Sequence, residues 1–225
     1  MHKSNFVIFL AELVGTFGLL VAATGSIVYD GMMGGTLGIG FISVMHFIGL
    51  WAMIFLFGRY SMAHFNPAVT VAYFVAKYIS AKQILVYFAA QAIGAFLGSL
   101  FVKYTFGDFA SLGINSPNYE YPVGLFFGIE VLATVFLMGS ILIAVNIKGL
   151  QTIFISTIIA GTVAVDVFFF GSVSGASMNP IRSLAPAIFS GVFDNLWLYW
   201  SATFVGSTTV AFIYRKKFSK SKSTS

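Results

Sequence analysis

The 225-residue sequence contains no cysteine and very few charged residues. Without cysteine the chain cannot form a disulfide and offers no thiolate to a metal ion. Only 8% of the residues are charged, whereas 58% are hydrophobic, and the mean hydropathy is +0.92. A soluble domain of this size does not need so much apolar surface. The composition therefore indicates a protein whose chain crosses a membrane several times.

The sequence also lacks the segments of about ten alternating residues that a membrane β-barrel would show. Its apolar runs are continuous and about twenty residues long, which is the length of a membrane-spanning helix. The first run contains Glu12 and is longer than the core of a signal peptide, so we expect it to be retained. We predict an all-α membrane protein with six transmembrane helices, at about residues 6–28, 36–57, 82–104, 122–147, 150–170 and 195–214.

The net charge of +5 does not indicate nucleic-acid binding, because the basic residues lie next to the ends of the predicted spans. Six spans place both termini on the same side of the membrane. Most basic residues then fall on that side: Lys3, Arg59, Lys77, Lys82, Lys148 and the tail residues Arg215, Lys216, Lys217, Lys220 and Lys222. By the positive-inside rule the termini are expected in the cytoplasm, with the chain in the plasma membrane and no nucleic-acid partner.

Two further apolar segments are too short to cross a bilayer. Each begins with an Asn-Pro pair, Asn66-Pro67 and Asn179-Pro180. Asn is a strong N-cap and Pro favours the first helical position, so both pairs predict helix starts. A helix over 67–77 would be roughly 16 Å long, against a hydrocarbon core of about 30 Å. We therefore predict two re-entrant half-helices, over 67–77 and 180–190.

The two halves of the chain repeat each other. The segment Ala11-Glu12-Leu13-Val14-Gly15-Thr16 is matched by Ile129-Glu130-Val131-Leu132-Ala133-Thr134, at nearly the same offset as the two Asn-Pro pairs. Three spans separate the halves, and an odd number reverses their orientation. A single transmembrane domain over 1–225 would comprise repeat one at about 6–104, repeat two at about 122–214 and a basic tail at 215–225. The half-helices would then enter from opposite faces and point their N-termini at each other.

Two of the predicted spans carry pairs of glycines, and a polar segment lies between these spans. Gly94 and Gly98 on the third span, and Gly124 and Gly128 on the fourth, have the GxxxG spacing that favours close helix packing. The segment over about 105–121 has the composition of an ordinary external loop.

With its two motifs the sequence resembles the aquaporin (major intrinsic protein) family, over nearly the whole chain. The motifs are Ala63-His64-Phe65-Asn66-Pro67-Ala68-Val69-Thr70 and Ser174-Gly175-Ala176-Ser177-Met178-Asn179-Pro180-Ile181-Arg182-Ser183. The resemblance implies six tilted helices, two half-helices in an inverted repeat, one pore per subunit and a homotetramer. It implies no cofactor and no metal.

The resemblance also implies which residues line the pore. Its two Asn-Pro motifs would be Asn66, Pro67 and Ala68, and Asn179, Pro180 and Ile181, the last standing where the family has Ala. Spacing from these motifs gives the expected selectivity filter: His46, Val167, Ala176 and Arg182. His64 would line the cytoplasmic half of the pore, and Glu12 and Glu130 would support the half-helix loops from behind.

Three positions favour the water-conducting branch over the glycerol-conducting branch. Ser183 stands where glycerol channels usually carry Asp, Ala187 where they carry Lys or Arg, and Tyr199-Trp200 where they carry Pro-Leu. The sequence thus predicts a passive channel for water, with ammonia and other small neutral solutes admitted beside Val167 and Ala176, and protons and ions excluded.

Other functions stay open at this point. The chain could be a glycerol or small-polyol facilitator, or a non-conducting structural membrane protein. It could also be a coupled secondary transporter, since Glu12, Glu130 and Asp166 are ionisable groups within the spans. Asp166 precedes Val167 and could accept a hydrogen bond from a loop or from His46. An enzyme is not expected, because no Ser/His, paired-Asp or metal-ligand pattern converges.

Overall fold

The computed structural model describes residues 4–218, so Lys3, Lys220 and Lys222 lie outside the described residues. Within them six helices are long and apolar enough to cross a membrane, which confirms the predicted spans. They are α1 (Asn5–Met32), α2 (Gly38–Ser61), α4 (Ala81–Phe106), α5 (Val123–Asn146), α6 (Thr152–Ser174) and α8 (Leu196–Phe218). Most of them extend a few residues beyond the predicted bounds, because the helices continue past the apolar segments that mark the hydrocarbon core.

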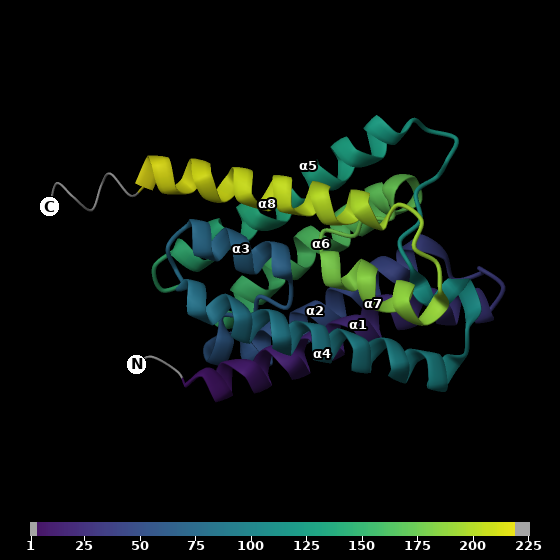
Figure 1. Cartoon of the computed structure of the whole chain (residues 1–225), viewed down its shortest axis with the longest axis horizontal. Helices are drawn as coiled ribbons and strands as arrows, with labels where there is room; N and C mark the ends of the chain where they lie inside the picture. The colour runs from purple at the N-terminus through teal and green to yellow at the C-terminus, as the bar shows by residue number, and fades with distance from the viewer. Residues whose placement is uncertain (1–3, 219–225) are drawn as a thin grey trace, which may run out of the picture.

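Two short helices lie between these spans, α3 (Pro67–Val75) and α7 (Pro180–Ser190). With 9 and 11 residues they reach only about 14 and 16 Å, roughly half the hydrocarbon thickness. Figure 1 shows α3 in the half of the molecule that carries both termini and α7 in the opposite half. Helix α3 ends two residues before the predicted end, and Lys77 just beyond it adopts a left-handed backbone with φ 68°.

The two repeats pack in the same way and exchange their half-helices. Helix α1 packs on α2 and α4, α5 packs on α6 and α8, and the contact between α2 and α6 joins the halves. Helix α3 of the first repeat packs against α8 of the second, and α7 of the second packs against α4 of the first. Lys103 of α4 donates to the carbonyl of Phe189 in the last turn of α7, at 3.1 Å. Each half-helix therefore packs against a span of the opposite repeat as well as against the last span of its own repeat.

Glycines in each repeat allow two helices to approach closely. A Cβ on Gly94 of α4 would lie 2.3 Å from the carbonyl oxygen of Leu13 on α1. A Cβ on Gly206 of α8 would lie 2.6 Å from the carbonyl oxygen of Val131 on α5. The predicted GxxxG packing thus holds for Gly94 and also for Gly98, where a Cβ would lie 3.0 Å from the carbonyl oxygen of Phe17 on α1. An added Cβ at Gly124 or Gly128 would meet nothing within 4 Å among the described residues.

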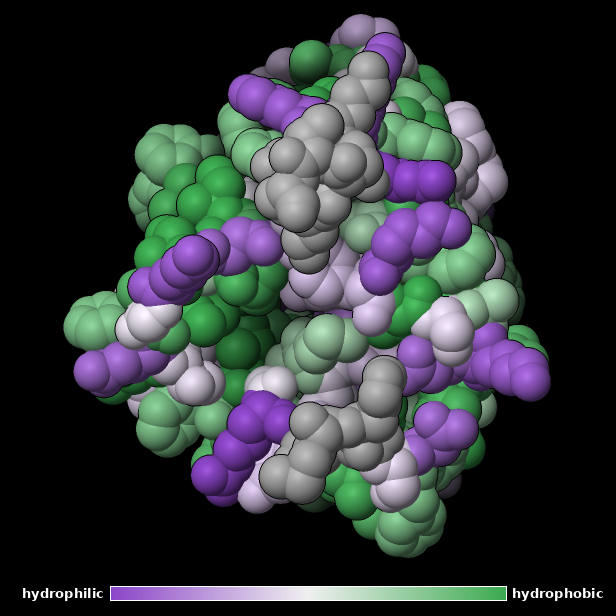
Figure 2. All heavy atoms as spheres, turned by 90° about the vertical axis from the view of Figure 1, so that its left-hand side faces the viewer, coloured by the Kyte–Doolittle hydropathy of each residue, from purple (hydrophilic) through white to green (hydrophobic). Residues whose placement is uncertain are grey.

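The face that carries both termini is polar, while the flanks of the molecule are apolar. Figure 2 looks onto this face and shows hydrophilic side chains distributed across it between hydrophobic ones. The helix ends there expose Arg59, Lys77, Lys82, Lys148, Arg215, Lys216 and Lys217. The predicted clustering of basic residues on one side therefore agrees with the arrangement of the helices.

We expect Gly94→Ala to destabilise the fold, because its methyl group would collide with the backbone of α1. Overpacking of this kind costs about 1–3 kcal/mol, which corresponds to a melting temperature lower by roughly 2–10 °C. Thermal unfolding of the detergent-solubilised protein measures the shift. Gly128→Ala is the matched control, and an equal shift in both variants would contradict this account of the α1–α4 contact.

Candidate functional site

A cavity of about 360 Å³ runs through the centre of the helix bundle. It begins at helix ends on the face that carries the termini, where Arg59, Met62 and Thr152 line it. It passes between the N-termini of α3 and α7 and reaches His46 and Arg182. The cavity therefore extends past the point where the half-helices meet.

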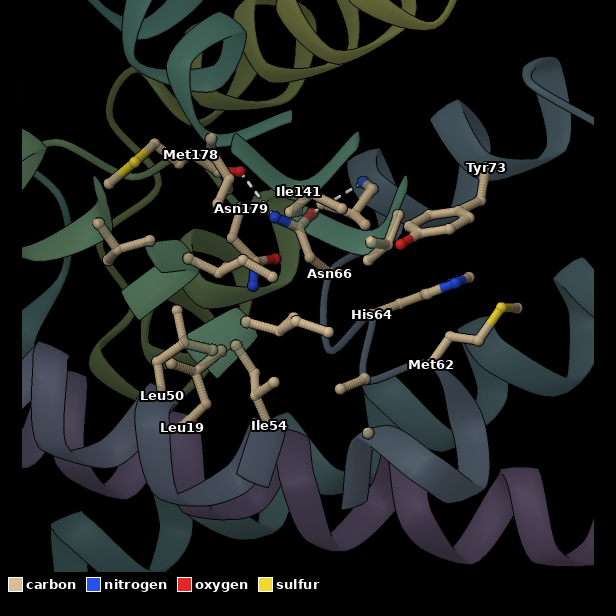
Figure 3. Close-up of a pocket in the computed structure, with 18 of the residues that line it drawn as sticks. Leu19, Leu50, Ile54, Met62, His64, Asn66, Tyr73, Ile141, Met178 and Asn179 are labelled. Atoms are coloured by element: carbon tan, nitrogen blue, oxygen red, sulfur yellow. Dashed lines mark hydrogen bonds between the residues drawn. The ribbon is translucent and has the colours of Figure 1, made fainter. Parts of the chain in front are cut away.

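Asn66 and Asn179 meet at the centre of this cavity, and both line it. Each caps its own half-helix: Asn66 Oδ1 accepts from the backbone N of Ala68 at 2.9 Å, and Asn179 Oδ1 from that of Ile181 at 3.2 Å. Figure 3 shows the two side chains next to each other, with Leu19, Leu50 and Ile54 on the opposite wall. The centre of the cavity thus has one polar side and one apolar side.

The two asparagines also join the repeats. Asn66 Nδ2 donates to the carbonyl of Met178 at 2.8 Å, and Asn179 Nδ2 donates to the carbonyl of Phe65 at 2.9 Å. An amide nitrogen carries two hydrogens, so each Asn keeps a second donor after this bond. Because both residues line the cavity, these donors are available to a small molecule with an oxygen or nitrogen acceptor.

The loops that precede α3 and α7 have the same unusual backbone. Met62, Ala63 and Phe65 have φ of 66°, 50° and 48°. The equivalent residues Gly175, Ala176 and Met178 have φ of 89°, 43° and 53°. Non-glycine residues in this left-handed region cost about 1–3 kcal/mol each unless their surroundings hold them. Both loops line the cavity, which is the situation in which irregular backbone is tolerated at membrane depth.

Glu12 of α1 holds the first of these loops. Its carboxylate accepts from the backbone N of His64 at 2.9 Å and of Phe65 at 2.7 Å. It also accepts from Ser61 Oγ at 2.6 Å and from Gln91 Nε2 at 2.9 Å. The side chain is fully buried and is not part of the cavity wall.

Glu130 of α5 holds the second loop in the same way. It accepts from the backbone N of Ser177 at 3.0 Å and of Met178 at 3.2 Å, and from Ser174 Oγ at 2.8 Å. It too is fully buried and absent from the cavity wall. Both glutamates therefore contact the loops from the side away from the cavity.

Sequence reasoning missed a second symmetric pair of contacts behind the loops. Tyr87 of α4 donates to the carbonyl of Ser61, and Tyr199 of α8 donates to the carbonyl of Ser174. The two tyrosines lie at almost the same offset as the two Asn-Pro pairs, and this offset was the signal available in the sequence. In each re-entrant loop a glutamate carboxylate thus accepts hydrogen bonds from backbone N–H groups, and a tyrosine hydroxyl donates a hydrogen bond to a backbone carbonyl.

Arg182 lies at the far end of the cavity and is held by the loop after α4. Its Nη1 donates to the carbonyl of Gly113 at 3.0 Å and to Asn115 Oδ1 at 2.6 Å. Asn115 Oδ1 also accepts from Ser183 Oγ at 2.7 Å. Gly113 ends η1 (Phe109–Gly113), a short turn that contains left-handed residues. The prediction of an ordinary loop over 105–121 was therefore incomplete, because Asn115 is buried and positions the guanidinium.

Three of the four expected filter residues share this end of the cavity, namely His46, Ala176 and Arg182. His46 Nδ1 donates to the carbonyl of Ile42 at 2.8 Å, which leaves Nε2 as an acceptor in the neutral ring. Val167 is not on the cavity wall. It lies one turn further along α6 than Val163, which lines the cavity. The structure thus brings together the histidine, the alanine and the arginine, and leaves Val167 one turn of α6 beyond the cavity-lining Val163.

The remaining motif residues lie behind the cavity wall. Pro67, Ala68, Pro180 and Ile181 are buried but do not line the cavity. Ile181, which replaces the alanine of the family pattern, packs in the hydrophobic core. Its larger side chain therefore does not narrow the space between the two asparagines.

The cavity wall carries positive charge. Its charged lining residues are Arg59 and Arg182, and its other ionisable lining residues are His46, His64, Tyr73 and Tyr78, without Asp or Glu among the described residues that line it. The N-termini of α3 and α7 each add roughly half a positive charge at the centre, and neither helix has an acidic residue in its first turn. The wall thus combines positive electrostatic potential with hydrogen-bond donors.

Asp166 remains without a role at this site. It is buried, and its Oδ2 has no hydrogen-bond partner among the described residues. The sequence left open a hydrogen bond from His46 to Asp166. Among the described residues this bond does not form, and His46 Nδ1 donates to the carbonyl of Ile42 instead.

Comparison with known proteins gives matches along the whole chain. The family model described as "Major intrinsic protein" matches residues 1–214. The chain is 33% identical to aquaporin NIP3-1 of Arabidopsis thaliana over 211 residues, which are 91% of this chain and 65% of that protein. It is 31% identical to aquaporin NIP1-2 of Oryza sativa subsp. japonica over 227 residues, which are 95% and 72% of the two chains. The chain thus spans about two thirds of the length of these relatives.

A solved structure has a similar fold. The X-ray structure of the aquaglyceroporin from Plasmodium falciparum matches with a TM-score of 0.86, over 99% of this chain and 100% of that chain. The sequence identity is 23%, so the likeness concerns the arrangement of the helices.

We expect Glu12→Ala to destabilise the protein, because it leaves the buried N–H groups of His64 and Phe65 without an acceptor. Each unsatisfied buried group costs about 1–3 kcal/mol, and the sum corresponds to a melting temperature lower by roughly 5–15 °C. Thermal unfolding in detergent checks the prediction. Glu120→Ala, at an exposed position, is the control, and similar melting temperatures for the two variants would argue against the anchoring role.

Proposed function

The chain belongs to the major intrinsic protein family, and on this premise we propose that it is a passive membrane channel that conducts water and ammonia and excludes protons and ions. The pair of asparagines at the centre of one cavity carries the proposal. Each is fixed by a hydrogen bond to the opposite loop and retains one amide donor on the cavity side. A water molecule that passes between α3 and α7 can accept a hydrogen bond there from each repeat in turn.

The charges on the wall support the exclusion of cations. Two half-helix N-termini face the same point, and Arg182 adds a full charge at the end of the cavity. Pore diameter, lining hydrogen bonds, an arginine and half-helix dipoles are the known sources of selectivity in aquaporin-type pores. A proton or metal cation would meet this field without a carboxylate to compensate it, whereas water and ammonia carry no net charge.

The buried glutamates argue against a coupled transporter. Coupling needs ionisable groups that exchange ions with the transport path, and Glu12 and Glu130 are fully buried behind the loops, where backbone and side-chain donors occupy their oxygens. The cavity itself argues against a purely structural role, because a closed protein would pack side chains between the half-helices.

Glycerol and other small polyols are a second candidate class of solute. The cavity has a polar side with the asparagines and an apolar side with Leu19, Leu50 and Ile54, which fits a molecule with hydroxyls along one edge (Figure 3). Against this, Ser183 occupies the position where glycerol channels usually carry Asp, and here it binds Asn115 and Ser177. We therefore rank glycerol below water.

The membrane setting belongs to the same proposal. The basic residues on the face with the termini support a cytoplasmic location of that face. The plasma membrane is the proposed location. A homotetramer with one pathway per subunit is the proposed assembly, in keeping with the large apolar side chains exposed on the helix flanks.

Proteoliposomes test the function directly. We expect purified protein to raise osmotic water permeability well above that of empty liposomes, to accelerate ammonia entry, and to leave proton leak unchanged. Glycerol entry should be slow at the same protein density. Stopped-flow light scattering in sucrose and in glycerol, and an internal pH dye in an ammonium gradient, measure these fluxes. Water permeability equal to that of empty liposomes would overturn the channel proposal, and fast glycerol entry would favour the polyol alternative.

Arg182→Val should widen the far end of the pathway and remove its fixed charge. We expect glycerol permeability to rise roughly tenfold, which corresponds to a barrier lower by about 1.4 kcal/mol, together with a measurable proton leak. Asn115→Ala, which removes one acceptor of the guanidinium, should raise glycerol permeability by a smaller factor. The same assays apply, with Lys82→Ala at an exposed position as control. Unchanged selectivity in Arg182→Val would exclude a filter at this end.

A further inference from the structure

We propose that Tyr73 forms a second selective narrowing of the pathway, between the asparagine pair and the face that carries the termini. Its hydroxyl would bind permeating solutes that form hydrogen bonds, and its ring would limit their size. The inference rests on the proposed channel function and deepens it, because it assigns selectivity to the half of the pathway away from Arg182.

Tyr73 lies on the cavity side of α3. Asn66, Val69 and Tyr73 follow the spacing of one helix face, and all three line the cavity. At 1.5 Å per residue, Tyr73 lies about 10 Å from Asn66 along the helix axis, toward the termini. Arg182 lies on the other side of the asparagines, so the two side chains bracket the centre of the pathway.

The Tyr73 side chain is only 2% exposed, and its hydroxyl makes no hydrogen bond among the described residues. The hydroxyl is not one of the fully buried polar atoms without a partner, and Tyr73 lines the cavity, so this oxygen is accessible from the cavity. Figure 3 shows this hydroxyl directed into the cavity, on the side of Asn66. A hydroxyl that is accessible from the cavity takes its hydrogen-bond partner from the contents of the cavity. A permeating water or alcohol can both donate to and accept from a phenol.

Aromatic contacts hold the ring at this place. The His64 ring stacks on Tyr73 with centroids 4.3 Å apart and on Tyr87 with centroids 4.2 Å apart. The ring of Tyr78 packs edge-on against Tyr73 at 5.2 Å. The Tyr78 hydroxyl in turn bonds Asn146 of α5 at 3.0 Å and Tyr214 of α8 at 2.8 Å. Tyr73 is therefore a fixed part of the wall.

The first repeat has no charged residue at the position equivalent to Arg182. Arg182 stands three residues after Asn179, and the equivalent residue of the first repeat is the apolar Val69. His64 cannot serve instead, because its Nδ1 is paired with Thr70 Oγ1 at 3.0 Å and its Nε2 is buried. Tyr73 lies between Asn66 and the mouth of the cavity, which is lined by Arg59, Tyr78 and Thr152. In this stretch its hydroxyl is the side-chain group that a solute can reach.

Two substitutions separate the hydroxyl from the ring. Tyr73→Phe removes an oxygen that makes no bond within the protein, so packing and melting temperature should stay unchanged. We expect its water permeability to fall about two- to fivefold, the scale of one lost neutral hydrogen bond. Tyr73→Ala removes the ring, and we expect the ratio of glycerol to water permeability to rise roughly tenfold. Tyr104→Phe and Tyr104→Ala are the matched controls, because Tyr104 is 84% exposed on the surface.

Permeabilities are measured by stopped-flow light scattering on proteoliposomes and divided by the amount of reconstituted protein. A changed ratio in Tyr73→Ala together with slower water flux in Tyr73→Phe supports the proposal. A conducting wild type whose water permeability and solute ratio are unaltered in both variants overturns the role of Tyr73 alone. A wild type that conducts neither solute overturns the channel function, and the role of Tyr73 with it.

Discussion

Backbone N–H groups that lie outside a helix at membrane depth need an acceptor inside the protein. Glu12 and Glu130 meet this requirement, because each carboxylate accepts the two consecutive N–H groups that precede an Asn-Pro pair. Without these bonds the left-handed backbone of the loops would be destabilised, and the N-termini of α3 and α7 would no longer be held at the same point. The placement of both asparagines, and so of the central donors, depends on this one interaction made twice.

The two repeats share this scaffold but differ in what they present to the cavity. The second repeat contributes Arg182, which the loop residue Asn115 holds in place by a hydrogen bond of 2.6 Å. The first repeat contributes the aromatic group of His64 and Tyr73 instead. The two repeats therefore support their half-helices in the same way. They differ in the side chains that line the cavity, with Arg182 toward one end and the aromatic residues His64 and Tyr73 toward the other.

The span count, the half-helices and their inverted relation could be predicted from the sequence, because apolar length and the Asn-Pro caps are local signals. The offset of Glu12 and Glu130 gave their equivalence in the repeat, whereas their contact with the loops was an expectation from the family resemblance. The position of Asn115 could not be predicted, because an Asn within a polar loop has the composition of any turn, and only the tertiary fold brings it to Arg182. The aromatic stack was hidden for the same reason: its residues come from a loop, from α3 and from α4.

The exchange of half-helices between the repeats has a consequence for biosynthesis. Helix α3 is made early, yet beside α4 it packs against α8, the last span to leave the ribosome. Its short apolar body cannot cross the bilayer unaided. The first repeat therefore gains its full set of contacts only after translation of the C-terminal span, so a chain truncated before α8 would leave α3 in contact with α4 but without its contacts to α8.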